Sequence, residues 1–227
     1  MRPRALYWMM LALLLAGCDG GERNAAVARK PDAPAAERPA PVVLFLGTSL
    51  TAGYGLAPEQ AYPALIQEKI DAAGLPHRVI NAGVSGETSA GALRRVDWLL
   101  HQPFDVLVLE TGANDMLRGT DLDSTRANIQ GIIDRVREAR PEADVVLLGM
   151  MAPPNLGNRY TDQFRRIYPD LARRNDVALV PFLLEGVGGV AELNLADGIH
   201  PNAEGQRRLA ETVWTVLEPE LREAARK

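Results

Sequence analysis

The sequence contains a single cysteine, only three histidines and no stretch rich in lysine and arginine. Because Cys18 has no partner in the chain, an intrachain disulfide is excluded as the basis of the fold. The formal net charge of -4 and the missing basic stretch argue against nucleic acid as a partner. The hydrophobic fraction of 47% and the length of 227 residues are ordinary for one globular α/β domain.

The N-terminal residues 1–17 predict a lipoprotein signal peptide. Arg2 and Arg4 precede an apolar run at residues 5–16, which is shorter than the roughly 20 residues that span a bilayer. The string Leu15-Ala16-Gly17-Cys18 resembles the bacterial lipobox, and this resemblance implies cleavage before Cys18 and lipid on its thiol. Two alternatives remain open, namely an ordinary cleavage site with a chance cysteine and a buried structural cysteine.

If the lipobox operates, the protein is exported and anchored by lipid to a bacterial membrane, facing the periplasm or the exterior. Residues 18–40 are rich in Ala and Pro, polar and aperiodic, which is typical of a flexible tether. We therefore expect the folded domain to occupy residues 41–227 and to be a monomer.

Short apolar runs alternate with amphipathic stretches along this domain. Strands that are apolar on both faces and alternate with helices predict a three-layer α/β/α fold around a five-stranded parallel sheet. The expected strands are residues 42–46, 78–80, 105–109, 144–148 and 177–180. The expected helices are residues 58–73, 89–100, 122–139, a stretch around 160–171, and 203–223.

Reactive residue types follow several of these strands. Ligands bind outside the carboxyl ends of the strands in such sheets. The segments at that end are residues 47–50, 81–83 and 112–115, together with residues 197–200 just before the last helix. A hydroxyl, a glycine amide, a carboxamide and a His/Asp pair are therefore expected along one rim.

The histidines allow a choice by elimination. His77 and His101 precede strands and are expected at the amino end of the sheet, where we interpret them as surface or half-buried polar residues. Only His200 is expected at the carboxyl end. It is the candidate general base.

Among the four serines, Ser49 is the favoured nucleophile because it sits on a turn directly after the first strand. Ser85 and Ser89, which follow the second strand, are the competitors. Ser124 begins a helix, where a capping role suits it.

The roles follow from the chemistry of these groups. A serine hydroxyl needs a base to take its proton, so His200 is assigned to Ser49, and Asp197 is assigned to hold the imidazole. An oxyanion needs preorganised donors, for which the amides of Ser49 and Gly83 and the side-chain amide of Asn114 are candidates.

At these places the sequence resembles the SGNH hydrolases, also called the GDSL lipase/esterase family. The resemblance extends over the whole domain and is closest to the bacterial branch of multifunctional arylesterase, acyl-CoA thioesterase and lysophospholipase. It implies a flavodoxin-like sheet order 2-1-3-4-5, a small-molecule ester or lysolipid substrate, no metal and no cofactor. The matching stretches are residues 47–50, 81–86 with Gly83, 112–115 and 197–202, and for the branch 49–56 and 151–157.

The sequence departs from the family at one position, because Thr48 stands where the family usually has Asp. The triad is unaffected, but the nucleophile turn loses a carboxylate that could support it. One hypothesis is that Thr48→Asp raises kcat/KM. The resemblance also implies acyl-chain contacts for the loop with Met116 and Leu117, for which ordinary packing under a loop is the alternative.

Other functions remain to be weighed against an esterase of this type. A carbohydrate or peptidoglycan O-acetylesterase would use the same machinery with a small acyl pocket and a polar groove. A lipid-anchored binding protein on a retained hydrolase fold would leave Ser49 unreactive. A metal on Asp197 and His200 lacks a third ligand on that rim, and Gly83-x-x-Gly86 lacks the lysine of a phosphate-binding loop.

Overall fold

The computed structural model describes residues 39–226, which fold around a five-stranded sheet. The strand order is β2-β1-β3-β4-β5, and every neighbouring pair is parallel. The α/β class and the order 2-1-3-4-5 are therefore confirmed. The strands are β1 (Val42–Gly47), β2 (Arg78–Gly83), β3 (Val106–Glu110), β4 (Asp144–Leu148) and β5 (Ala178–Val180).

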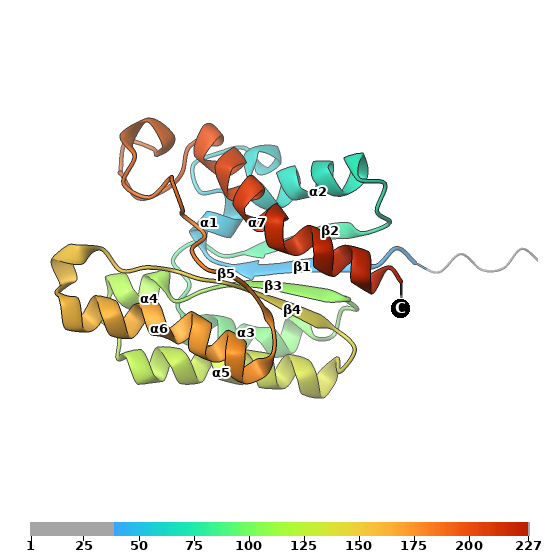
Figure 1. The fold of residues 1–227 in the computed structure, drawn as a ribbon, viewed down its shortest axis with the longest axis horizontal. Helices are drawn as coiled ribbons and strands as arrows, with labels where there is room; N and C mark the ends of the chain where they lie inside the picture. Colours follow the sequence, from blue (N-terminus) through green and yellow to red (C-terminus); the bar gives the residue numbers. More distant parts are fainter. Residues whose placement is uncertain (1–38, 227) are drawn as a thin grey trace, which may run out of the picture. The chain divides into compact units, whose positions relative to one another are not determined.

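Helices cover both faces of the sheet, with α1, α2 and α7 on one face and α3 to α6 on the other (Figure 1). The α-helices are α1 (Ser49–Ala52), α2 (Tyr62–Ala72), α3 (Ser89–Leu99), α4 (Ala113–Leu117), α5 (Leu122–Ala139), α6 (Asn158–Asn175) and α7 (Ala203–Ala224). Short 3-10 turns are η1 (Pro58–Gln60), η2 (Pro154–Leu156) and η3 (Ala191–Leu193). Between residues 39 and 226, no helix combines the length and apolar character needed to cross a membrane.

The first expected helix is interrupted. Residues 58–73 were expected to be continuous, but Ala61 is extended, with φ -69° and ψ 142°, and separates η1 from α2. Pro63 lies in the first turn of α2, where its missing N–H is tolerated. In a continuous helix its ring would clash with the carbonyl of residue 59, so the helix restarts at Tyr62.

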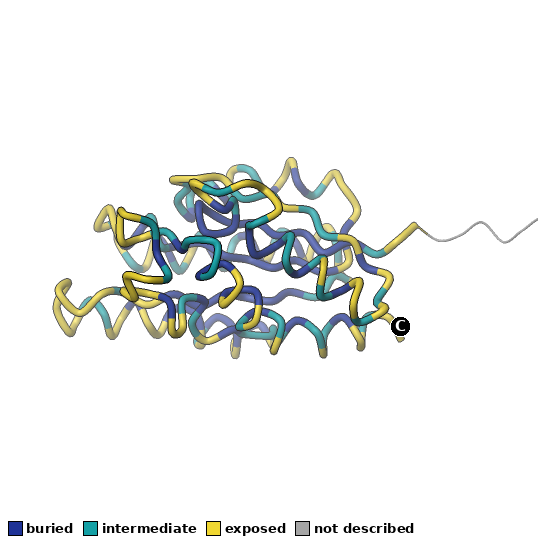
Figure 2. The backbone as a smooth tube through the Cα atoms, turned by 90° about the horizontal axis from the view of Figure 1, so that it is seen from above, coloured by how far each residue is buried: buried dark blue, intermediate teal, exposed yellow. Residues whose placement is uncertain are grey.

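The core lies around the central strands. Every residue of β1 and β3 is buried, and the tube view shows these strands as a dark interior (Figure 2). The edge strand β2, by contrast, is partly exposed along its length and is not apolar throughout. An edge strand has a neighbour on one side only, so β2 tolerates polar residues such as Asn81.

Two short helices, α1 and α4, were not predicted from the sequence. They begin at Ser49 and Ala113, just after β1 and β3. Each is too short for a hydrophobic periodicity to be visible, and each carries a candidate site residue. The predicted signal peptide over residues 1–17 and Cys18 lie outside the described residues, as does most of the predicted tether.

Candidate active site

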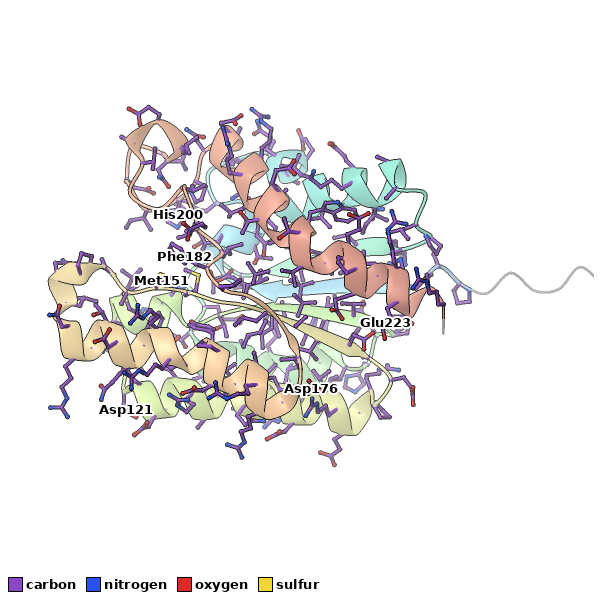
Figure 3. All side chains as sticks on the ribbon, viewed as in Figure 1. Asp121, Met151, Asp176, Phe182, His200 and Glu223 are labelled. Carbon is purple, nitrogen blue, oxygen red and sulfur yellow. The ribbon has the colours of Figure 1, made fainter. Side chains whose placement is uncertain are left out.

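The candidate catalytic residues lie at the carboxyl end of the sheet. Ser49 opens α1 after β1, and Asn114 lies in α4 after β3. His200 comes from the long connection between β5 and α7. Figure 3 shows His200 close to Phe182 and Met151 at this end, whereas Glu223 of α7 lies toward the other end.

Ser49, His200 and Asp197 form a chain of hydrogen bonds. Nε2 of His200 lies 3.0 Å from Oγ of Ser49, and Nδ1 lies 2.7 Å from Oδ2 of Asp197. The second carboxylate oxygen of Asp197 accepts the amides of Ile199 at 2.9 Å and His200 at 3.0 Å. The three side chains selected from the sequence are thus brought together, although Ser49 and His200 are 151 positions apart.

The carboxyl group of Asp197 is held in its ionised form. The backbone amide of His200, then the imidazole and the amide of Ile199, lower the pKa of Asp197 to about 2. An ionised carboxylate can only accept hydrogen bonds, so Nδ1 of His200 carries the ring proton. The lone pair on Nε2 is then directed at the hydroxyl of Ser49.

The ring of Tyr54 lies against the imidazole of His200, with centroids 4.4 Å apart and planes at 36°. The imidazole therefore has an aromatic neighbour, and both ring nitrogens have hydrogen-bond partners. Within residues 39–226, no group of three or more His, Cys, Asp or Glu side chains is arranged to hold a metal ion.

Two of the residues predicted as oxyanion donors, Ser49 and Asn114, line the same cleft. The Ser49 amide occupies the first position of α1, where the helix itself supplies no acceptor. The side chain of Asn114 lines the same cleft as Ser49, and its Nδ2 donates to the carbonyl of Glu87 at 3.0 Å. A carboxamide nitrogen carries two hydrogens, so Asn114 keeps one for a ligand while Glu87 fixes its orientation.

The structure contradicts the assignment of Gly83 as the third donor. Its amide already donates to Oδ1 of Asn81 at 2.9 Å, and a Cβ at this position would lie 2.4 Å from the amide nitrogen of Ala52. Gly83 is therefore a glycine because α1 packs directly on it. Gly86, with φ 78°, lines the cleft with Ser49 and Asn114 instead.

The competing serines have other surroundings. Ser89 is fully buried, and its Oγ donates to Asp115 at 2.6 Å. Ser85 lines the cleft, but the imidazole of His200 is hydrogen-bonded to Ser49 instead. Ser124 lies in the first turn of α5, bonded to the capping residue Asp121.

A buried carboxylate lies behind the nucleophile turn. Glu110, the last residue of β3, accepts hydrogen bonds from the amide of Thr48 at 2.7 Å and from its hydroxyl at 2.9 Å. It also accepts the hydroxyl of Thr51 at 2.9 Å, which is itself bonded to the Tyr62 hydroxyl. Burial raises the pKa of Glu110, an effect that the amides and hydroxyls of Thr48 and Thr51 partly offset.

An apolar cleft of about 670 Å³ opens beside the catalytic chain. Both Met116 and Leu117 line it. Leu117 is 56% exposed, so simple packing under a loop does not account for this side chain. The other large apolar side chains of the cleft are Leu50, Tyr54, Met150, Met151, Pro153, Pro154, Phe182, Leu184 and Ile199.

Sequence reasoning missed Gly86, Glu110 and Tyr54. Gly86 could have been found as the second glycine of the turn that follows β2. Glu110 could have been found as the acidic residue that ends an otherwise aliphatic strand. The contact of Tyr54 with His200 joins residues far apart in sequence and leaves no local signal.

Comparison with known proteins gives the class of the chain. The model of the GDSL-like lipase/acylhydrolase family matches residues 45–208. Esterase TesA of Pseudomonas aeruginosa is 41% identical over 213 residues, which cover 93% of this chain and all of that protein. Thioesterase 1/protease 1/lysophospholipase L1 of Escherichia coli is 40% identical over 182 residues, or 79% of this chain and 85% of that protein.

A solved structure points to the same class. The psychrotrophic esterase EstA from Pseudoalteromonas, inhibited by monoethylphosphonate, has a TM-score of 0.75 and 33% identity, covering 80% of this chain and 98% of its own. The protein is a carboxylic ester hydrolase. It belongs to the GDSL-like lipase/acylhydrolase family.

Proposed function

We propose that this serine esterase is of the lysophospholipase, arylesterase and thioesterase type and works through an acyl-enzyme on Ser49. The observation that carries this proposal is the imidazole of His200, which bridges Ser49 and Asp197 at the wall of an apolar cleft. A serine hydroxyl is a weak nucleophile, and an imidazole nitrogen 3.0 Å away can take its proton as the oxygen attacks.

The proposed reaction has two halves. Oγ of Ser49 attacks the carbonyl carbon of the ester while its proton moves to Nε2 of His200, and the leaving alcohol then takes that proton. Water attacks the acyl-enzyme in the same way, giving its proton to His200, and the carboxylic acid leaves as Oγ of Ser49 is reprotonated. Asp197 remains ionised throughout and stabilises the imidazolium that forms in each half.

We assign the oxyanion to the amides of Ser49 and Gly86 and to Nδ2 of Asn114. This assignment is supported by the presence of all three residues in the lining of one cleft and by the fixed orientation of Asn114. Removal of one such donor costs about 3 kcal/mol of transition-state stabilisation, so Asn114→Ala should lower kcat on the order of a hundredfold. An unchanged kcat in that variant would remove Asn114 from the oxyanion site.

The shape and lining of the cleft favour an ester with an acyl chain of several carbons. A volume of about 670 Å³ with mostly apolar walls suits a hydrocarbon chain, because apolar surface gains free energy when it leaves water. The Escherichia coli relative is named a thioesterase, protease and lysophospholipase, and the one from Pseudomonas aeruginosa an esterase. An O-acetylesterase would instead need a small acyl pocket and a polar groove.

The test is hydrolysis of p-nitrophenyl esters from acetate to palmitate by the purified protein. We expect the rate to peak at medium or long chains and Ser49→Ala to lower kcat by at least about 10⁴-fold. Ser124→Ala, at a site that lies in α5 outside the cleft, is the matched control and should keep full activity.

Other outcomes would redirect the assignment. A sharp preference for acetate would favour the O-acetylesterase. Full activity in Ser49→Ala would direct attention to Ser85. A chain that neither hydrolyses these esters nor reacts with a fluorophosphonate would be a binding protein.

We also propose that the mature protein begins at Cys18, carries lipid there and is exported to a bacterial membrane. The support is the apolar run at residues 5–16 and the lipobox-like residues 15–18. Mass spectrometry of the N-terminal peptide from the membrane fraction should find Cys18 with added diacylglycerol. A Cys18→Ser variant that stays equally membrane-bound would count against the anchor.

A further inference from the structure

The position of Glu110 is unusual for a carboxylate. β3 is otherwise aliphatic, and Glu110 is fully buried at its end, one residue past the pairing of Leu46 with Leu109. Gly47 of β1 makes room for both Thr51 and Glu110, because a Cβ there would lie 2.5 Å from Cβ of Thr51 and 2.9 Å from Oε2 of Glu110. The carboxylate therefore occupies the space directly behind the turn that carries Ser49.

The hydrogen bonds of Glu110 reach both sides of the nucleophile. Thr48, one residue before Ser49, gives its amide and hydroxyl, and Thr51, two residues after, gives its hydroxyl. Thr48 is the N-cap of α1, yet its side chain makes no capping hydrogen bond. Its hydroxyl turns to Glu110 instead, so this carboxylate fixes the first turn of α1 from behind.

Keeping an anionic group in this place has a cost. Among the ion pairs of residues 39–226, none involves Glu110. A buried carboxylate without a cation loses several kcal/mol of hydration, which hydrogen bonds restore only in part. A leucine would avoid this loss, but it would leave the donors of Thr48 and Thr51 without an acceptor.

We propose that Glu110 is a positioning residue for Ser49: its carboxylate holds the Thr48–Thr51 turn so that Oγ of Ser49 stays within reach of Nε2 of His200. The proposal rests on the proposed role of Ser49 as nucleophile. Thr48 and Glu110 act as one unit, in which the carboxylate comes from β3 and the turn supplies the hydroxyl. A misplacement of about 1 Å in a reacting group can lower a rate by about a hundredfold, so the placement of this turn controls acylation.

The same geometry argues against the hypothesis that Thr48→Asp raises activity. Thr48 is buried, and its Oγ1 lies 2.9 Å from both carboxylate oxygens of Glu110. A second carboxylate there would face the first at close range, and two like charges in a buried site disfavour one another. The substitution should become acceptable only when Glu110 is removed at the same time.

The first experiment compares Glu110→Gln with Asn175→Ala in the full-length protein. Asn175 is buried and hydrogen-bonded at the end of α6, so its loss destabilises the fold away from Ser49. The measurements are Tm, kcat, KM and the rate at which a fluorophosphonate labels Ser49. We expect Glu110→Gln to lower kcat and labelling on the order of 10- to 100-fold with KM within about twofold, and Asn175→Ala to lower Tm alone.

The second experiment transfers the carboxylate from position 110 to position 48. It tests the proposal even if Glu110→Gln fails to fold. Thr48→Asp alone should label at least about tenfold more slowly than the wild type. The double variant Thr48→Asp with Glu110→Leu should label at least about tenfold faster than either single variant. This recovery is not expected if Glu110 only contributes to the stability of the core.

The possible outcomes distinguish the positioning role of Glu110 from the role of Ser49 as nucleophile. Wild-type labelling rates in Glu110→Gln, or a double variant no faster than its parents, would overturn the positioning role and leave the esterase assignment intact. A wild-type protein whose Ser49 is not labelled would instead overturn the proposed nucleophile, and the positioning role with it.

Discussion

Ser49 and His200 come from regions that are held in opposite ways. The turn that carries Ser49 is buried and anchored to the interior through Glu110. His200 lies on a connection whose residues near Asp197 are exposed, and it is held by a carboxylate three positions away. The carboxyl group behind the nucleophile has a pKa raised by burial, whereas hydrogen bonds lower the pKa of the one behind the base.

The difference shows two ways to fix a side chain. Local hydrogen bonds from the amides of Ile199 and His200 hold Asp197, so this part of the site can be near solvent without losing its geometry. The Ser49 turn depends on a partner 62 positions from Thr48, so it is coupled to the packing of the core. Substitutions in the loop around Asp197 should therefore change kcat. Substitutions behind the Ser49 turn should change both kcat and the free energy of unfolding.

Among the changes that test this comparison, the largest effect is expected from Asp197→Asn. The variant loses the negative charge that fixes the ring proton of His200 on Nδ1, and kcat should fall on the order of 10³- to 10⁴-fold. The side chain is 37% exposed, so Tm should change little. Steady-state kinetics and a melting curve test this expectation, and a large loss of Tm would show that the loop is coupled to the core after all.

A smaller effect, on stability, is expected from Thr51→Val. The change removes one of the donors to Oε2 of Glu110, which keeps the amide and hydroxyl of Thr48, and it leaves the hydroxyl of Tyr62 without its partner. This should lower the free energy of unfolding by about 1–3 kcal/mol. Denaturant unfolding measures the change. Thr215→Val is the control, because Thr215 is exposed and bonds only within its own helix, and equal losses in both variants would contradict the assigned network.

The two carboxyl groups should also give opposite pH dependences of stability. Glu110 binds its proton more tightly in the folded state, so its contribution falls as pH rises from about 4.5 toward its raised pKa. Asp197 contributes fully above its ordinary value of 3.8 and loses its contribution as pH falls toward about 2. Unfolding of the wild type, Glu110→Gln and Asp197→Asn, measured from about pH 2 to about pH 8, should separate these windows. Parallel curves for all three proteins would refute both shifts.

The smallest effect is expected from Tyr54→Ala. The ring of Tyr54 contacts the imidazole of His200 and is 50% exposed, so its loss should lower kcat by roughly two- to fivefold. Tyr54→Phe keeps the ring and should retain the wild-type rate. If the Phe variant were as slow as the Ala variant, the hydroxyl rather than the ring would be the important group.

Much of the fold and part of the site could be predicted from the sequence. The bounds of α5 and β4 agree with the expected residues 122–139 and 144–148, because a long amphipathic period and a run of buried aliphatic residues are local patterns. Ser49, Asp197 and His200 were found because each follows a strand or precedes a helix at one rim. Gly83 was chosen over Gly86 because spacing along the chain does not show which amide is already bonded.

The amino-acid sequence by itself determined the order of strands and helices, and with it the end of the sheet where the reactive residues gather. Only the tertiary structure decided how they are held. The pairing of Glu110 with the Ser49 turn, the contact of Tyr54 with His200 and the packing of Gly83 on α1 each join segments separated in the chain. Such contacts depend on distances in the folded core, which the local periodicity of a sequence does not encode.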